Sequence, residues 1–394
     1  MTDLSELLHH KISQSGPLSI SRYLQDCLMH PEGGYYQRQA VFGTEGDFIT
    51  APEISQIFGE MLAAFHAHIH TLFGNPSDVI CFEAGPGKGT LAADMVRTYH
   101  ALSPTLATAP LYLLEEASLR RAEQQQALGK VTPIFINDLS DLPPKPLFGV
   151  ANEFFDALGV DQIIWQADQT NHPHSGKWHH RLIDSDGQAF SFVIGPALNE
   201  DELADYAPLP DHPETGDILE VSRLSQHMIA KLAHHIAHYG GALLIIDYGK
   251  TDHHGDSLQA VRHHKPVDIL THQGDADMTH WVDFARLAKT ASDHQARLIG
   301  PVPQGRFLLE LGIGARAEDL RQTNHKKTDD HAPADNAPAD HAPDANNDRQ
   351  LLAAIDRLVS PAHMGQAFKI ALLVPQGEGL PPGFSSLDQK GPSA

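Results

Sequence analysis

Residues 82–90 read FEAGPGKGT, a stretch in which three glycines alternate with other residues directly after a short apolar run. Glycine adopts positive φ without strain and lets another molecule approach the backbone closely. Residues 78–84 have the length and composition of a buried strand, and residues 90–102 carry their large apolar side chains at helical spacing. The stretch therefore predicts a strand, a glycine loop and a helix, the unit with which α/β folds bind nucleotides.

The spacing within the loop narrows the choice of nucleotide. A dinucleotide fingerprint requires glycine or alanine where Thr90 stands, and the P-loop pattern also fails. The E-x-G-x-G-x-G spacing of Glu83, Gly85, Gly87 and Gly89 resembles motif I of class I S-adenosylmethionine (SAM) methyltransferases. Glu83 would then be the acid near the cationic end of the ligand. A tight turn that holds no ligand remains the alternative.

Composition argues against several classes of protein. The 28 Lys and Arg against 50 Asp and Glu give a net charge of −22, which repels nucleic acid and anionic lipid. No apolar run reaches the roughly 20 residues of a membrane span, and the N-terminus lacks a signal or transit pattern. We therefore expect a cytoplasmic protein of bacterial type. The 27 histidines show no metal-ligand spacing, so no metal is expected.

The order of apolar segments predicts the fold class. Strands are expected at 109–116, 131–138, 147–158 and 242–249, and helices at 53–74 and 219–241. This alternation favours an α/β fold with a parallel, doubly wound sheet, whose ligands lie beyond the carboxyl ends of the strands. Residues 160–195 alternate like a β-hairpin, and the repetitive, polar 323–348 segment is expected to be disordered.

These segments suggest the following organisation along the chain. It comprises an N-terminal helical and flap segment (1–75), the first part of the SAM-binding core (76–160), an inserted β-hairpin region (161–218), the core continuation with a substrate-side region (219–322), the low-complexity insertion (323–348), a C-terminal helix and strand (349–380) and a tail (381–394).

Acids at the expected strand ends are candidates for cofactor contacts. A carboxylate after the second strand can accept bonds from both ribose hydroxyls, and Glu115 is preferred there over the adjacent Glu116. Asp138, after the third strand, suits the adenine amino group. Solvated strand-end acids are the alternative. In GDFITAPEISQIFGE, residues 46–60, Thr50 and Ser55 could belong to a flap over SAM, together with Asp47 and Glu53, or could simply cap helices.

ANEFFDAL, residues 151–158, follows the fourth expected strand, where reacting groups are expected. Asn152, Glu153 and Asp156 are the candidate catalytic residues. An arginine acceptor stays charged in water, with a pKa above about 12, and two carboxylates could orient it and take the leaving proton. Alternatively, the two phenylalanines are core residues and the acids are solvated.

Several long segments resemble the MidA-like SAM-dependent methyltransferase family. They include GPLSISRYLQDCLMHPEGGYY, GDFITAPEISQIFGE, FEAGPGKGTL, ANEFFDALGVDQ and DADMTHWVDFARLA. The resemblance implies a class I methyltransferase core, Rossmann-like, with an added N-terminal helical segment and an inserted β-rich and helical region. It implies SAM as cofactor, bound at Glu83, Gly85, Pro86, Gly87 and Gly89. It also implies a protein arginine as acceptor, on a respiratory complex I subunit by resemblance to the mitochondrial members. A chaperone-like assembly factor that acts by binding, and a small-molecule methyltransferase, are the alternatives.

Overall fold

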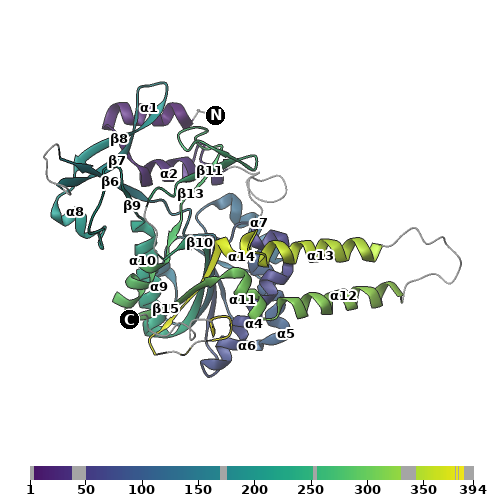
Figure 1. The fold of residues 1–394 in the computed structure, drawn as a ribbon. Helices are drawn as coiled ribbons and strands as arrows, with labels where there is room; N and C mark the ends of the chain where they lie inside the picture. The colour runs from purple at the N-terminus through teal and green to yellow at the C-terminus, as the bar shows by residue number, and fades with distance from the viewer. Residues whose placement is uncertain are drawn as a thin grey trace. The chain divides into compact units, whose positions relative to one another are not determined.

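The computed structural model describes residues 4–37, 50–168, 175–251, 255–329, 343–377, 379 and 381–385 (Figure 1). The chain divides into two units. The β-rich unit takes Met1–Phe48, Glu153–Leu232 and Tyr248–Thr290, and the core unit takes Ile49–Asn152, Ala233–Asp247 and Ala291–Ala394. Each unit is therefore assembled from segments that are distant in the sequence.

The core unit is built on a twisted sheet with the order β15-β16-β10-β5-β2-β3-β4. The strands are β2 (Ile80–Ala84), β3 (Leu111–Leu114), β4 (Ile134–Ile136), β5 (Leu147–Asn152), β10 (Gly241–Lys250), β15 (Ala296–Pro303) and β16 (Phe368–Pro375). The pairs β2–β3, β3–β4, β2–β5 and β5–β10 are parallel, whereas β15 and β16 are antiparallel. The order reverses between β2 and β5, so the predicted doubly wound fold is confirmed and its switch point lies beside the glycine loop.

Burial explains why the central segments form strands. Every residue of β2 and β5 is buried, and so are the first seven residues of β10, as expected for parallel strands covered on both faces. The strands are shorter than the sequence suggests: β3 and β4 begin two or three residues later than expected. Both expected segments begin with residues that include proline or polar side chains, which explains why the strands start later.

Helices cover the sheet. They are α3 (Ala51–Ile54), α4 (Gln56–Leu72), α5 (Thr90–Leu102), α6 (Pro104–Thr108), α7 (Ser118–Leu128), α11 (Gln304–Glu310), α12 (Ile313–Asp329), α13 (Pro343–Val359), α14 (Met364–Ala367) and the second half of α9 (Arg223–Tyr239). Helices α4 and α5 approach closely at Gly59, where a Cβ would lie 2.6 Å from Asp94 Cβ. Their apolar faces pack with β2 and β5 in one core that includes Phe58, Leu91 and Phe148.

The β-rich unit contains a sheet with the order β1-β7-β6-β9, and β8 pairs with β7. Its elements are α1 (Leu4–Ser15), β1 (Leu18–Ser19), α2 (Ile20–Met29), η1 (Tyr35–Gln37), β6 (Asp161–Ala167), β7 (Gly176–Ser185), β8 (Phe190–Ala197), α8 (Glu200–Ala204), β9 (Ile218–Val221), β11 (Gln259–Arg262), β12 (Lys265–Val267), β13 (Asp277–Thr279), β14 (Val282–Asp283) and most of α10 (Phe284–Asp293). Apolar residues of α1 and α2 form a core with Ile183 and Phe190.

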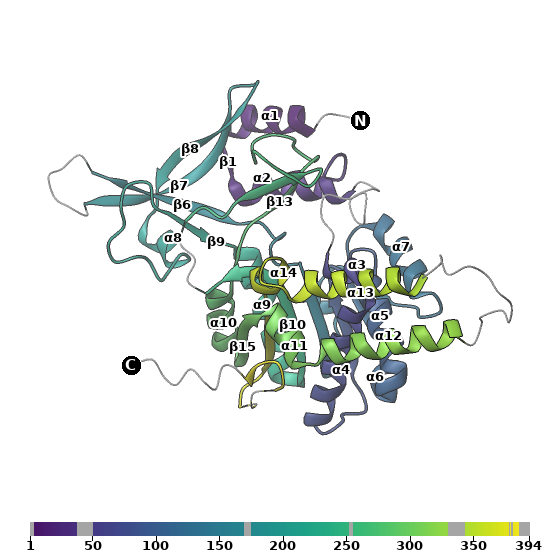
Figure 2. The same ribbon diagram turned by 45° about the vertical axis from the view of Figure 1, so that its right-hand side comes forward.

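Two expected segments differ in the structure. The helix expected from residue 219 begins at Arg223, because Ile218–Val221 pair with β6 as strand β9. The ends of the 323–348 segment, which is expected to be disordered, belong to helices, since α12 runs to Asp329 and α13 begins at Pro343; residues 330–342 lie outside the described residues. Figures 1 and 2 show α12 and α13 side by side. Arg321 Nε lies 3.0 Å from Asp348 Oδ2, so an ion pair between the two helices supports their extension.

Candidate functional site

The glycine loop lies at the carboxyl end of β2 and leads into α5. Gly85, Gly87 and Gly89 have φ of 63°, 52° and 82°, which side chains other than glycine rarely adopt. A Cβ on Gly87 would meet nothing within 4 Å, so this backbone is open to close approach. Gly89 N donates to Pro86 O at 2.7 Å and closes the turn. The predicted strand, loop and helix are therefore all present.

Helix α7 contacts the loop at Gly89. A Cβ on Gly89 would lie 3.0 Å from Gln124 Cα, so any other residue would require α7 to move by a few tenths of an ångström. The Gln124 side chain is completely buried, and its Nε2 donates to Gly87 O at 2.8 Å and to Glu115 Oε2 at 2.9 Å. Sequence reasoning did not identify Gln124, which connects the loop with the acid after β3.

The two candidate ribose acids differ in environment. Glu115 is partly buried, whereas Glu116 is exposed. Glu115 Oε1 accepts a bond from Ala117 N at 2.8 Å, and Oε2 accepts the bond from Gln124. A carboxylate has about four lone-pair sites, so each oxygen retains roughly one for another donor. This arrangement favours Glu115 over Glu116 for the two ribose hydroxyls, a role that stays a prediction.

Glu83 lies within β2 and is only 3% exposed. The backbone of Ala92, in the first turn of α5, faces its carboxyl, whose Oε2 is buried without a hydrogen-bond partner among the described residues. Burial raises the pKa of Glu83 to about 8, although the backbone of Ala92 opposes this rise. The carboxyl is therefore mainly neutral at pH 7. The expected contact with the cationic end of the ligand stays a prediction, and a neutral carboxyl also fits a role in holding the start of α5.

The segment before α4 is held against the glycine loop by Glu53. Glu53 Oε1 accepts a bond from Thr90 Oγ1 at 2.6 Å, and Oε2 lies 3.9 Å from Lys88 Nζ. This carboxylate therefore fixes α3 to both the loop and the start of α5. The contact fits the flap interpretation of this segment, for which Glu53 is one of the four residues suggested by the sequence.

Thr50 and Ser55 occupy helix-capping positions. Ser55 precedes α4 and its hydroxyl accepts a bond from Ile57 N at 3.3 Å, which is the capping alternative. Thr50 is at the N-cap position of α3 but makes no side-chain capping bond there. Asp47, the other flap candidate, lies outside the described residues.

Asp138 follows β4 at the edge where adenine is expected. It is exposed, and its Oδ1 accepts a bond from Ser140 N at 2.8 Å, capping the short helix η2 (Leu139–Asp141). Arg121 donates through Nε to Glu115 O at 3.0 Å and also bonds the side chain of Asn137. Arg121 thus ties together the chain segments that follow β3 and β4.

The candidate catalytic residues follow β5. Asn152 is its last residue and is 8% exposed. Glu153 has φ of 50°, an uncommon backbone conformation for a residue other than glycine, and such conformations often occur at functional sites. Asp156 is 7% exposed, and Phe155 is completely buried with the Phe154 ring edge-on at 5.4 Å. Phe155 is therefore core, whereas Asp156 is not a freely solvated acid.

Asp156 belongs to a polar group in the β-rich unit that includes Tyr36 and Asp277. The Tyr36 hydroxyl donates to Asp277 Oδ1 at 3.1 Å. Burial, followed by the carboxylates of Asp277 and Asp156, raises the pKa of Tyr36 well above its usual value. Sequence reasoning missed Asp277 and Tyr36, although both lie in segments that carry the family resemblance.

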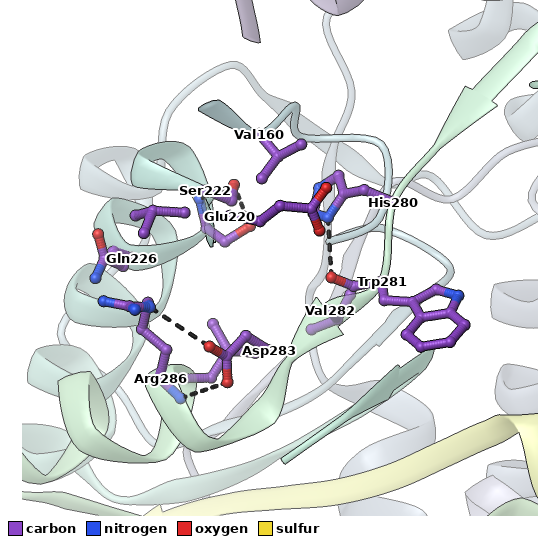
Figure 3. Close-up of a pocket in the computed structure, with 12 residues that line it drawn as sticks. Val160, Glu220, Ser222, Gln226, His280, Trp281, Val282, Asp283 and Arg286 are labelled. Atoms are coloured by element: carbon purple, nitrogen blue, oxygen red, sulfur yellow. Dashed lines mark hydrogen bonds and ion pairs between the residues drawn. The ribbon is translucent and has the colours of Figure 1, made fainter. Parts of the chain in front are cut away.

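A cavity in the β-rich unit lies between the β9–α9 junction and the segment from His280 to Leu287 (Figure 3). It offers about 20 Å³ to a water molecule's centre, room for roughly one water. The buried Glu220 carboxylate beside it accepts bonds from Gln162 Nε2 at 2.6 Å and from Ser257 N and Oγ at 3.0 and 2.5 Å. This cavity is too small for a nucleoside.

Neither a membrane-spanning helix nor a metal-binding cluster occurs in the described part of the chain. No helix there is long and apolar enough to cross a membrane. No group of three or more His, Cys, Asp or Glu side chains in those same residues is arranged to hold a metal ion.

Comparison with known proteins gives consistent matches. Residues 61–302 match a family model described as S-adenosyl-L-methionine-dependent methyltransferase. "Protein arginine methyltransferase NDUFAF7, mitochondrial" from Xenopus tropicalis is 31% identical over 98% of this chain and 91% of that protein. The protein of the same name from Homo sapiens is 31% identical over 95% and 84%. A crystal structure of a Burkholderia thailandensis protein bound to S-adenosyl-homocysteine matches with a TM-score of 0.78 and 25% identity, over 97% of this chain and 94% of that one.

These relatives contradict the expected cytoplasmic location, because they are named as mitochondrial proteins. The expectation rested on the lack of a leader pattern, and such a lack does not specify a compartment.

Proposed function

The chain belongs to the SAM-dependent methyltransferase family, and on that premise we propose that it methylates arginine side chains of a partner protein. That it is a SAM-dependent methyltransferase follows from the family match and from the related structure that holds S-adenosyl-homocysteine. The observation that carries the arginine acceptor is the 31% identity to proteins named arginine methyltransferases, over nearly the whole chain.

The core unit offers groups that fit SAM. In this proposal the backbone of Gly85, Pro86, Gly87 and Gly89 lies against the methionine and ribose portions, because the loop leaves open space at Gly87. Glu115 accepts bonds from the ribose hydroxyls with the lone pairs that its protein partners leave.

The remaining cofactor-side residues have narrower proposed roles. Asp138, which caps η2, accepts a bond from the adenine amino group. Thr50 and Ser55 place the flap that Glu53 holds to the loop, with Ser55 acting through the start of α4. Glu83 acts indirectly, by fixing the first turn of α5 through Ala92.

Asn152, Glu153 and Asp156 are the proposed acceptor-side residues. Bound SAM supplies a methyl group on a positively charged sulfur, which is transferred to a nucleophile in line with the departing sulfur. An arginine side chain is a poor nucleophile while its charge is delocalised over three nitrogens. Glu153 and Asp156 would hold two of its N–H groups and accept the proton released as the new N–C bond forms, and Asn152 would help to orient it.

Two variants distinguish methyl transfer from cofactor binding. Glu153→Gln and Asp156→Asn should reduce methyl transfer by at least about 100-fold, because each removes a charged acceptor from the reaction. Both should bind S-adenosyl-homocysteine within about threefold of wild type. Methylarginine would be quantified by mass spectrometry in proteomes from wild-type and variant strains, and cofactor binding by calorimetry.

Glu116→Gln is the matched control, since Glu116 is exposed and the substitution removes the same charge. Normal methylarginine levels in the Glu153→Gln strain would refute the catalytic role. A wild-type protein that binds the cofactor but methylates only small molecules would refute the protein acceptor.

The identity of the partner is a finer proposal. The family resemblance supports a subunit of a respiratory complex as the methylated protein. Comparison of methylarginine in isolated respiratory complexes, with and without this protein, tests that choice. Loss of methylarginine only from proteins outside those complexes would contradict it.

A further inference from the structure

We propose that Gln124 is a positioning residue for the cofactor, which orients the Glu115 carboxylate and fixes it relative to the glycine loop. This inference rests on the proposed role of Glu115 as the ribose acceptor. Gln124 lies in α7, the helix that follows β3, and its side chain has no solvent exposure. The glycine-loop pattern of methyltransferases does not predict a role for Gln124, because that pattern ends at Gly89.

The hydrogen bonds of Gln124 require an amide. Its Nε2 donates to a carbonyl, Gly87 O at 2.8 Å, and to a carboxylate, Glu115 Oε2 at 2.9 Å. Both partners are acceptors, so the atom between them must be the NH₂ group and the amide orientation is determined. Methionine or leucine would fill the same space but donate nothing, and glutamate would place a third acceptor against the other two.

The amide oxygen of Gln124 indicates that its N–H bonds determine how the side chain is oriented. Gln124 Oε1 is buried and has no hydrogen-bond partner among the described residues. A buried acceptor without a donor is unfavourable. If the two N–H bonds were dispensable, the side chain would be expected to turn so that its oxygen could accept a bond. The arrangement therefore favours the bonds to the loop and the acid over satisfaction of the amide oxygen.

The geometry at Glu115 shows what the orientation achieves. Ala117 N donates to Oε1 at 2.8 Å and Gln124 donates to Oε2, one protein donor for each oxygen. Each oxygen keeps about one lone-pair site, and the two sites match the two neighbouring hydroxyls of a ribose. A carboxylate held from both sides is ordered before the ligand arrives, which reduces the entropy lost on binding.

Gly89 makes this arrangement possible. A Cβ at that position would lie 3.0 Å from Gln124 Cα and 3.3 Å from Gln124 Cβ. The third glycine of the motif therefore permits α7 to approach the loop, and the buried amide reaches Gly87 O because of that approach. Charged or titratable side chains on the surrounding elements are Lys88 in the loop, Asp94, Arg97 and His100 on α5, Glu115 and Glu116 after β3, and Arg120, Arg121 and Glu123 on α7.

The test measures S-adenosyl-homocysteine affinity by calorimetry on the full-length protein. Gln124→Met should weaken binding about 10-fold at every pH, since it removes both donors and keeps the volume. Gln124→Glu should weaken it about 100-fold at pH 8 and recover about 10-fold by pH 6, as the two adjacent carboxyls take up a shared proton. Gln126→Glu, an exposed change on the same helix, should stay within about twofold of wild type.

A double variant provides a further comparison. Gln124→Glu combined with Glu115→Gln leaves one carboxyl in place of two adjacent ones, so the gain in affinity between pH 8 and pH 6 that is expected for Gln124→Glu should fall below about twofold. A merely structural role for Gln124 predicts no pH dependence in either variant. Equal affinity of Gln124→Glu at pH 6 and pH 8, or a pH dependence that persists in the double variant, overturns the proposal.

Glu115→Gln alone separates this inference from the one on which it rests. If Glu115→Gln binds S-adenosyl-homocysteine as tightly as wild type, the proposed ribose acceptor is wrong. If Glu115→Gln weakens binding but both Gln124 variants match wild type, the positioning role of Gln124 is wrong and the ribose role stands.

Discussion

Replacement of Glu83 by glutamine should make the stability of the core unit less sensitive to pH. The carboxyl is 3% exposed and faces the backbone of Ala92, and burial raises its pKa to about 8. Glutamine has nearly the same shape and keeps an acceptor for Ala92 N. The substitution therefore removes the titration of this group and changes little else.

The direction of the change in stability with pH follows from whether the folded or the unfolded state binds the proton. Between pH 4.5 and about 8 the unfolded carboxyl is ionised while the folded one retains its proton, so stability falls as pH rises. Below pH 4.5 both states are protonated, and above pH 8 both are ionised, so the slope disappears at either end. At about 1.4 kcal/mol per pH unit, and allowing for partial ionisation near pH 8, wild type should lose about 2 kcal/mol relative to Glu83→Gln between pH 6 and pH 8.

Denaturant unfolding monitored by far-ultraviolet circular dichroism at pH 6, 7 and 8 is the appropriate assay. Tryptophan fluorescence is unsuitable, because Trp165, Trp178 and Trp281 all lie in the β-rich unit. Glu116→Gln controls for the loss of one negative charge from an exposed position. Equal pH dependence in wild type and Glu83→Gln would show that the carboxyl is ionised in the folded protein, and the argument from burial would be refuted.

Three further substitutions test contacts in the two units. Gly89→Ala should cost about 1–2 kcal/mol from its left-handed backbone, with an added loss of S-adenosyl-homocysteine affinity from the contact with α7. Gly187→Ala, with φ of 89° and nothing within 4 Å, reports the backbone cost alone, so equal destabilisation of both would exclude the contact. Thr90→Val should destabilise α3 and the loop by about 1 kcal/mol in chemical unfolding, since it removes a hydroxyl bonded to a partly exposed carboxylate; an unchanged midpoint would argue against a held flap. Ser257→Ala should cost about 2–3 kcal/mol, read by tryptophan fluorescence, because the buried Glu220 carboxylate loses a donor and the backbone of residue 281 loses an acceptor; a loss below about 0.5 kcal/mol would contradict this.

The sequence alone determined the central unit of the fold and the class of cofactor. The apolar run before Gly85 and the helical spacing after Gly89 are local patterns, and the predicted helix from Thr90 to Leu102 has the observed bounds. The spacing of the loop glycines reflects a local backbone requirement, since all three have positive φ. Local conformation is encoded by nearby residues, which is why these predictions needed no knowledge of the rest of the chain.

Only the tertiary structure decided which side chains meet. Gln124 follows Gly87 by 37 residues, and Glu53 precedes Thr90 by the same separation, yet both pairs are hydrogen-bonded. The sequence placed Glu83 near the cationic end of the cofactor, which stays a prediction, whereas the rise of its pKa to about 8 comes from burial in the sheet. Such pairings depend on how helices pack on the sheet and on the local exclusion of water. A glutamine in a polar helix carries no sign of either, because burial and hydrogen-bond partners are properties of the folded arrangement.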